Sequence, residues 1–257
     1  MKKIIILSLL SIFSTIILKA QTPLKLDHIF ILIDTTNNIH SELTKVGLTK
    51  ATDWKTSHSQ QGTTGEFFLF HNFYLEILYI SKQEEANENI ENFGSNYVER
   101  SRWKNNRYFP FGLGLVLKDS TQVIPFETYT YKAKWIGEDS SLKMAKNNKD
   151  LKEPLIFVEP IEWAYKVLDN TEQLEIQKNP DAKNYRLNSL GIEKLTKVIL
   201  IIPKKEKEFS KTLKALKKLN NVEIRSGKEP LMILEFDTKK QKKELNFEKE
   251  LRLKIKY

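Results

Sequence analysis

Hydrophobic and polar residues alternate along this chain with two different periods, and together they predict an α+β protein. Apolar runs of about four to nine residues, rich in Ile, Leu, Val and Phe, are typical of buried strands. Such runs occupy residues 26–33, 66–70, 73–80, 111–117, 126–134, 155–158, 195–202, 222–225 and 231–237. Residues 49–56 carry a weaker strand pattern, and residues 251–257 alternate between apolar and polar, the period of a final strand. Apolar residues spaced at i, i+4 and i+7, as in Ile39, Leu43 and Val46, predict short amphipathic helices. The other predicted helices fall within residues 82–106, 163–168 and 209–216.

The order strand–helix–strand–strand–strand is predicted twice, at about residues 26–80 and 194–257. A repeated unit of this kind buries its apolar face most simply against a second copy of itself. We therefore expect two βαβββ modules that pack together as a cupped, open-barrel-like mixed sheet with helices outside. Residues 82–190 would then form an insertion between the modules.

The first 20 residues have the layout of a secretory signal peptide. Lys2 and Lys3 precede an apolar run over residues 4–18, and Ala20 supplies a small residue for cleavage. The run is shorter than the roughly 20 residues that a membrane-spanning helix needs. We expect cleavage after Ala20 and export to a periplasm or the extracellular space, without stable insertion in a membrane. An uncleaved anchor is the alternative.

The composition of the chain excludes several kinds of functional site. The chain has 257 residues and no cysteine, which excludes disulfides, thiolate metal sites and a cysteine nucleophile. Its formal charge of +9 comes largely from lysine runs. Without a zinc-finger, RNP or P-loop pattern, these runs indicate solvated faces rather than a nucleic-acid partner. A small molecule is the expected partner, and whether the chain forms a homodimer stays open.

Two polar residues interrupt strands that are otherwise apolar. His28 lies in the run 26–33, and Glu76 lies in the run 73–80. A buried imidazole or carboxylate without a partner costs several kcal/mol, on the order of 2–7. These two side chains could therefore bond to each other, bind a metal or line a ligand cavity, and the residues alone leave all three alternatives open.

The motifs around these strands resemble the glyoxalase-like domain family of the vicinal oxygen chelate superfamily. The loop 58–63 (His-Ser-Gln-Gln-Gly-Thr) precedes two apolar strands, and Asp27-His28 stands in the first strand. Residues 110–112 (Pro-Phe-Gly) and 190–192 (Leu-Gly-Ile) are similar to later parts of the same family. The resemblance extends over about residues 26–257.

The resemblance implies paired modules around a cup that holds a divalent ion in the metal-dependent members. Ligands there come from the first and fourth strands of each module. This pattern places His28 and Glu76 at the metal from the first module and Glu235 from the second. Lys197 occupies the remaining position, where a protonated amine cannot coordinate a metal. The implied ligands are therefore His28, Glu76 and Glu235, with metal identity open.

Two functions follow from this reading. The first is a metal-dependent lyase or isomerase that acts on a small carbonyl compound, with Glu76 as the catalytic carboxylate. The alternative is a metal-free protein that binds a small molecule in the same cup, which Lys197 would favour. Either function would use a ligand-binding rim, for which the expected residues are His58, Gln61, Gly62, Trp103 and Lys197.

Overall fold

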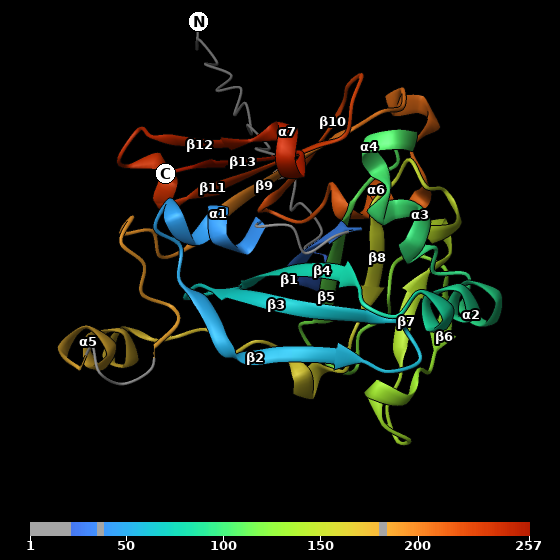
Figure 1. Ribbon diagram of the computed structural model, residues 1–257, viewed down its shortest axis with the longest axis horizontal. Coiled ribbons are helices and arrows are strands. Elements are labelled where there is room, and N and C mark those ends of the chain that lie inside the picture. The colour runs from blue at the N-terminus through green and yellow to red at the C-terminus, as the bar shows by residue number, and fades with distance from the viewer. Residues whose placement is uncertain (1–21, 35–38, 180–183) are drawn as a thin grey trace, which may run out of the picture.

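The computed structural model describes residues 22–34, 39–179 and 184–257, which form an α+β protein with two mixed sheets (Figure 1). The expected signal peptide at residues 1–20 lies outside the described residues. Within the described ranges, no helix combines the length and the apolar character needed to cross a membrane.

The larger sheet has eight strands in the order β2-β3-β4-β1-β5-β8-β7-β6. Its strands are β1 (Leu24–Ile33), β2 (Lys50–His58), β3 (Thr63–Leu69), β4 (Tyr74–Ile80), β5 (Phe111–Leu117), β6 (Thr128–Tyr131), β7 (Leu142–Ala145) and β8 (Leu155–Val158). Strands β1 and β4 pair in parallel, as do β5 and β8, and β1 joins the two halves through an antiparallel pairing with β5. Strands β2 and β6 end the sheet, which is therefore not a closed barrel.

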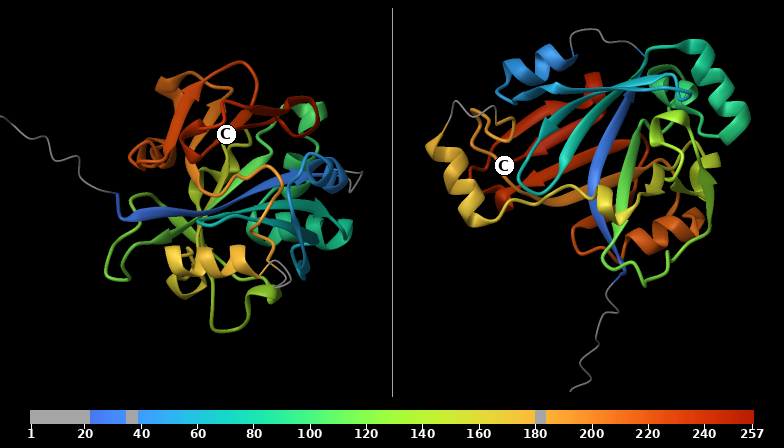
Figure 2. Two further views of the ribbon diagram at one scale, coloured as in Figure 1. Left: turned by 90° about the vertical axis from the view of Figure 1, so that its left-hand side faces the viewer. Right: turned by 90° about the horizontal axis from the view of Figure 1, so that it is seen from below.

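The smaller sheet has five strands in the order β10-β9-β11-β13-β12. Its strands are β9 (Leu195–Ile202), β10 (Val222–Ser226), β11 (Leu231–Phe236), β12 (Glu244–Phe247) and β13 (Leu253–Lys256). This sheet lies against one face of the eight-stranded sheet, as the orange and red strands show in both views of Figure 2.

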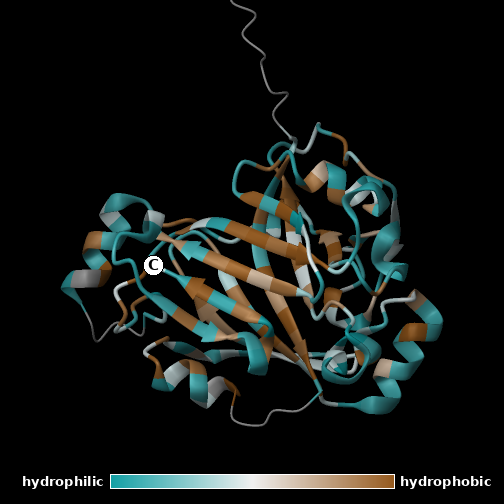
Figure 3. Ribbon diagram, turned by 90° about the horizontal axis from the view of Figure 1, so that it is seen from above, coloured by the Kyte–Doolittle hydropathy of each residue, from teal (hydrophilic) through white to brown (hydrophobic). Residues whose placement is uncertain are grey.

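Short helices connect the strands. The α-helices are α1 (Ile39–Lys45), α2 (Gln83–Phe93), α3 (Tyr97–Ser101), α4 (Trp103–Asn106), α5 (Asn170–Lys178), α6 (Lys211–Leu216) and α7 (Glu248–Leu251). The 3-10 turns are η1 (Lys134–Ile136), η2 (Lys146–Lys149), η3 (Ile161–Trp163), η4 (Glu206–Glu208) and η5 (Asp237–Lys239). Hydrophobic residues concentrate along the strands, whereas the helices carry many hydrophilic ones (Figure 3).

The strand pairing differs from the expected one. The first module, which ends at β4, continues into the strands of the supposed insertion, β5 to β8, rather than into residues 194–257. Residues 194–257 also have another topology: β9 pairs in parallel with β10, its neighbour in sequence, whereas β1 pairs in parallel with β4. Similar hydrophobic periods therefore produced two different sheets, because a period fixes which residues are buried but not which strands pair.

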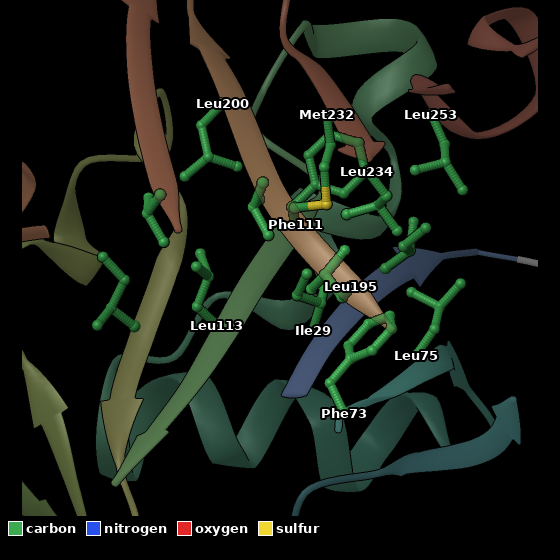
Figure 4. Packing of buried hydrophobic residues seen from close by; sticks show 14 of the residues in the cluster. Ile29, Phe73, Leu75, Phe111, Leu113, Leu195, Leu200, Met232, Leu234 and Leu253 are labelled. Carbon is green, nitrogen blue, oxygen red and sulfur yellow. The ribbon is translucent and has the colours of Figure 1, made fainter. Parts of the chain in front are cut away.

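The main hydrophobic core fills the space between the two sheets. Alternate residues of β1 point into it, among them Ile29 and Ile31, and so do Met232 and Leu234 of β11. Figure 4 shows Ile29, Met232 and Leu234 among the side chains that meet between the sheets. A second, smaller core covers the opposite face of the eight-stranded sheet and includes Phe30.

Polar contacts near the ends of strands fix the two sheets to each other. The Asn72 side chain, in the turn before β4, donates to the carbonyl of Leu195 and accepts from its N–H, both at 2.9 Å. Lys204, after β9, bonds to the buried Glu153 at 2.6 Å and to Asp150 at 2.7 Å. The sheets are therefore held in one orientation by side-chain contacts as well as by the core.

Removal of a side chain from the core between the sheets should lower the stability of the whole fold. Leu234 is 0% exposed. We expect Leu234→Ala to reduce the free energy of unfolding by about 2–5 kcal/mol, because it leaves a cavity that the sheets cannot close. Leu174→Ala on α5, where the side chain is 52% exposed, is the matched control and should change it by less than about 0.5 kcal/mol. Equal urea midpoints for the two variants would contradict this packing.

Candidate functional site

A cavity of about 240 Å³ opens on the face of the eight-stranded sheet that points away from the five-stranded sheet. His28 and Glu76 both line it, and a place in a ligand cavity is one of the three alternatives that the sequence left open for them. His58 and Gln61 line it from the end of β2 and the turn that follows. Glu159, directly after β8, completes its charged groups.

Alternation along the strands explains why these residues meet. Ile29 in β1 and Ile77 in β4 point into the core between the sheets, so that His28 and Glu76 point to the other side. Strand β8 follows the same rule: Ile156 belongs to the core between the sheets, and Phe157 and Glu159 face the cavity. The cavity is thus the second face of strands whose first face is the main core.

Two glycines make room for the charged side chains. A Cβ atom on Gly114 of β5 would lie 2.1 Å from Cε1 of His28, and one on Gly65 of β3 would lie 1.9 Å from Oε1 of Glu76. Any larger residue would displace these groups, because ordinary contacts begin above 3 Å. The imidazole and the carboxylate therefore lie directly against the backbone of a neighbouring strand.

Asp27, His28 and Glu159 form a buried cluster whose ligand atoms all lie within 4.8 Å of one another. His28 Nδ1 lies 3.0 Å from Asp27 Oδ2 and 3.9 Å from Glu159 Oε1. Asp27 precedes His28, yet both reach the cluster because the pairing with β5 shifts between Leu26 and His28. The backbone N–H of Tyr165 donates to Asp27 Oδ1 at 2.6 Å and holds this carboxylate in place.

The two carboxyl groups of the cluster have opposite pKa shifts. Burial raises the pKa of Glu159, and the negative charge of Asp27 raises it further. Burial also acts to raise the pKa of Asp27, but the hydrogen bond and the charge of His28 outweigh it, so the pKa of Asp27 is lowered. Near neutral pH, Asp27 is therefore the ionised member, and Glu159 retains a proton that a bound cation could replace.

Glu76 and His58 form a second pair across the cavity. Burial raises the pKa of Glu76 to about 8, and its Oε1 has no hydrogen-bond partner among the described residues. Oε1 lies 3.9 Å from His58 Nε2. Burial, assisted by the nearby charge of His28, lowers the pKa of His58 to about 4. The pair therefore joins a neutral imidazole to a carboxyl group that gains and loses its proton near physiological pH.

Gln61 fixes the wall beside this pair. Its Nε2 donates to Thr63 Oγ1 at 2.7 Å, and its Oε1 accepts from the Tyr131 hydroxyl at 2.8 Å and from Trp135 Nε1 at 3.2 Å. Thr63 Oγ1 also lies 3.1 Å from His58 Nδ1. Gln61 thus lines the cavity as expected, but most of its hydrogen-bonding groups are used to hold neighbouring side chains.

Gly62 has a structural position. Its φ angle is +73°, and a Cβ there would lie 2.4 Å from the backbone N of Ala86 in α2. Its carbonyl accepts from the N–H groups of Ser81 and Lys82. Gly62 does not line the cavity, so its expected contact with a ligand is replaced by a close approach of α2.

The structure separates Glu235 and Lys197 from the cavity. Both lie on the five-stranded sheet, paired in register across β11 and β9. Their neighbours Leu234 and Val198 point into the core between the sheets, so Glu235 and Lys197 point to its outer side. There Glu235 pairs with Lys239 at 3.3 Å, and Lys197 pairs with Glu223 at 3.3 Å. A shared site of Glu235 with His28 is therefore wrong, because both sheets lie between them.

Trp103 also lies elsewhere: it is 3% exposed and packs with Arg252, whose guanidinium is 5.5 Å from its ring. The tryptophans that do line the cavity are Trp135 and Trp163, which the sequence reasoning missed. It also missed Glu159, which directly follows the uniformly apolar run 155–158, so that no alternation in the sequence marks the face to which it belongs.

No family model matches this chain, and no curated protein matches it either. Among solved structures, it is similar to a hypothetical protein from Staphylococcus aureus, with 13% sequence identity and a TM-score of 0.49. The similarity covers 91% of this chain and 98% of that chain. A likeness at this level does not carry over a function.

The raised pKa of Glu76 predicts a loss of stability as the pH rises. In the unfolded chain the carboxyl ionises near 4.5, whereas in the folded protein it ionises near 8. Its contribution to stability is therefore complete below about pH 4.5 and is lost as the pH rises through 8, by about 5 kcal/mol. Glu76→Gln should flatten this part of the profile of unfolding free energy against pH.

The exposed Glu88→Gln in α2 is the control and should leave the profile unchanged. The slope that remains in Glu76→Gln combines Glu159, whose raised pKa acts in the same direction, with His58 and His71, whose lowered pKa values act in the opposite direction. A profile for Glu76→Gln that coincides with wild type between pH 5 and 8.5 would show that Glu76 is not desolvated as described.

Proposed function

We propose that the cavity is a catalytic site in which Asp27, His28 and Glu159 hold a divalent cation and Glu76 transfers a proton on a small carbonyl compound. This is a lyase or isomerase reaction of the kind that the resemblance to the glyoxalase-like family implies. The observation that carries the proposal is the convergence of buried acidic groups: Glu76 and Glu159 each have a carboxylate oxygen without a hydrogen-bond partner among the described residues. Such groups are costly to bury unless they serve a ligand.

The donor set fits a divalent ion. One imidazole nitrogen and two carboxylates suit manganese, iron, zinc or nickel, with water in the remaining positions. The two carboxylates, once ionised, offset the charge of such an ion, which would replace the proton held by Glu159. The Tyr165 N–H already bonds to the second oxygen of Asp27 and orients it.

A divalent ion in this position would polarise the carbonyl oxygen of a substrate and stabilise negative charge that develops on it. Glu76, with a pKa of about 8, is suited to remove a proton from the carbon next to the carbonyl and to return it. His58, held through Nδ1 by Thr63, directs Nε2 toward Glu76 and limits how that carboxyl group can turn. In an isomerase cycle, the proton returns to the neighbouring carbon, so no other reactant is required.

A second candidate function is metal-free binding of a small molecule. The cluster can exist without a metal because Glu159 and Asp27 can share a proton. The sequence-based support for this alternative has fallen away, since Lys197 lies on the other sheet and does not neutralise the cavity. Export through residues 1–20 and a homodimer remain predictions that accompany either function.

Metal content tests the first proposal. After incubation with a divalent metal and removal of the excess, the wild-type chain should hold close to one ion per chain by elemental mass spectrometry. His28→Ala and Glu159→Gln should each lower the affinity by more than about tenfold, because each removes a ligand. Glu235→Gln is the matched control and should retain the ion, since Glu235 lies on the outer face of the other sheet. Absence of metal from the wild type, or an equal loss in Glu235→Gln, would contradict the assignment.

Proton transfer tests the role of Glu76 separately. With hydroxyacetone at saturating concentration in D₂O, the wild type should catalyse exchange of the protons next to the carbonyl, followed by NMR. Glu76→Gln should lower that rate by about 100-fold or more, because the amide cannot accept the proton. The variant should still bind the metal, and Glu88→Gln should exchange at the wild-type rate. Unchanged exchange in a metal-loaded Glu76→Gln protein would remove Glu76 from the chemistry.

A further inference from the structure

The cavity combines polar side chains with aromatic ones. His28, Glu76 and Glu159 project from the face of the eight-stranded sheet that forms the floor of the cavity. Phe30 and Phe157 project from the same face, two residues from His28 and Glu159, and stack with each other with ring centroids 6.0 Å apart and planes 23° apart. Aromatic surfaces of this kind favour a flat apolar group, because ring contacts add to the free energy gained from removing apolar surface from water.

Two tryptophans form the wall from the side of η1 and η3. Their ring centroids lie 6.5 Å apart. The Trp135 indole is held by the bond to Gln61 and by contact with the His58 ring at 4.6 Å. Trp163 has no comparable anchor among the described contacts, and it is 36% exposed. A tryptophan so exposed at the margin of a cavity is available to cover a ligand that enters beside the fixed indole.

Charge restricts the ligand further. None of the described side chains that line the cavity is lysine or arginine. The acids are instead Glu76 and Glu159, which hold their protons near neutral pH, and the nearby Asp27, which is bonded to His28. A charged ligand would therefore lose its hydration in a region of low dielectric without a free side chain of opposite charge to replace it.

The volume of the cavity limits the size of the ligand. A cavity of about 150 Å³ in another protein accepts benzene. The 240 Å³ of this cavity is enough for one aromatic ring and a short side chain, but not for a nucleotide or a lipid. Because the polar groups lie at the floor, the polar end of the ligand must be compact and the ring must lie between the aromatic walls.

We propose that the ligand of this cavity is an uncharged aryl compound with a short oxygen-bearing side chain, such as an aryl α-hydroxyketone. The ring lies between Phe157 and the two tryptophans, and Trp163 determines the preference for it. The position of the oxygens at the floor rests on the proposed function; the preference for an uncharged aryl group rests on the walls and the charges alone.

The test compares matched probes by isothermal titration calorimetry on the purified chain, both loaded with Mn²⁺ and treated with a chelator. The probes are 2-hydroxyacetophenone, hydroxyacetone, which lacks the ring, phenylglyoxylate, which is anionic, and phenyltrimethylammonium, which is cationic. We expect 2-hydroxyacetophenone to bind at least about tenfold more tightly than hydroxyacetone to both preparations, because the ring contacts favour it. In the chelator-treated chain, where no metal attracts the anion, it should also bind at least about tenfold more tightly than either ion. Equal binding of hydroxyacetone, or tighter binding of either ion to the chelator-treated chain, would overturn the proposal.

Tryptophan variants locate the preference. Trp163→Ala should weaken the binding of 2-hydroxyacetophenone by about threefold to tenfold and leave the affinity for hydroxyacetone unchanged. Trp163→Phe should restore most of the lost affinity. Trp54→Ala is the control, because Trp54 is 44% exposed on β2 and does not line the cavity. If Trp163→Ala loses affinity for both probes, or changes the affinity for neither, the role of Trp163 is refuted.

The two preparations separate this inference from the proposed function. If Mn²⁺ does not bind but 2-hydroxyacetophenone is still preferred over the three other probes, the aryl preference stands and the metal site fails. If Mn²⁺ binds and the preference is absent, the aryl preference fails and the metal site stands.

Discussion

The packing of two sheets face to face is the constraint on which the site depends. It commits one set of alternating residues in β1, β4, β5 and β8 to the core between the sheets, where Ile29, Ile77 and Ile156 are 0% exposed. The intervening residues must then face the other way, and they include His28 and Glu76. The cavity is therefore built by the same period-2 geometry that builds the core. Its position cannot shift without exchanging the buried and cavity-lining faces of every central strand.

Local pattern was enough to predict most of the elements and the overall class. The apolar runs at 111–117, 155–158 and 195–202 coincide with β5, β8 and β9, and the spacing of Ile39, Leu43 and Val46 corresponds to α1. Two short strands were not predicted. Strand β7 lies within a polar stretch, and β12 is a partly exposed edge strand with little apolar character. The expected helix at residues 163–168 is absent: the 3-10 turn η3 ends at Trp163, residues 164–169 have no regular secondary structure, and α5 begins at Asn170.

The hydrophobic pattern could not predict which distant strands pair. It identifies the buried face of a strand, but several strands with a similar pattern could pair with the same neighbour. Leu26–Ile33 and Leu195–Ile202 are similar in sequence, but they lie in different sheets. Matching them led to the wrong prediction that Lys197 and Glu235 belong to the site of His28, which lies on the far side of both sheets. The correct candidate, Glu159, follows β8 by one residue and could be recognised only when β8 was known to be a neighbour of β5.

His28 and Glu76, in contrast, were identified from burial alone, because an ionisable residue within an apolar strand requires an explanation wherever the strand is placed. The same logic extends to the finished site. Folding this chain buries Asp27, Glu76 and Glu159 near one another, without a lysine or arginine among the described cavity walls. The raised pKa values of Glu76 and Glu159 show the effect of this arrangement: near neutral pH, both carboxyl groups tend to keep their protons rather than ionise.

A fold that needed only a stable interior would do better with apolar residues at these positions, since replacing buried ionic groups by well-packed hydrophobic ones is often neutral or stabilising. Gly65 and Gly114 sharpen the argument. Each leaves space that a larger side chain would fill, and each space is taken by Glu76 or His28 rather than by a packed methyl group. The second face of these strands is therefore less tightly packed than the first, and it places carboxyl groups and an imidazole around an enclosed volume. A bound cation and an uncharged ligand would explain this arrangement, because the cation would neutralise the carboxylates and the ligand would supply the missing apolar contacts.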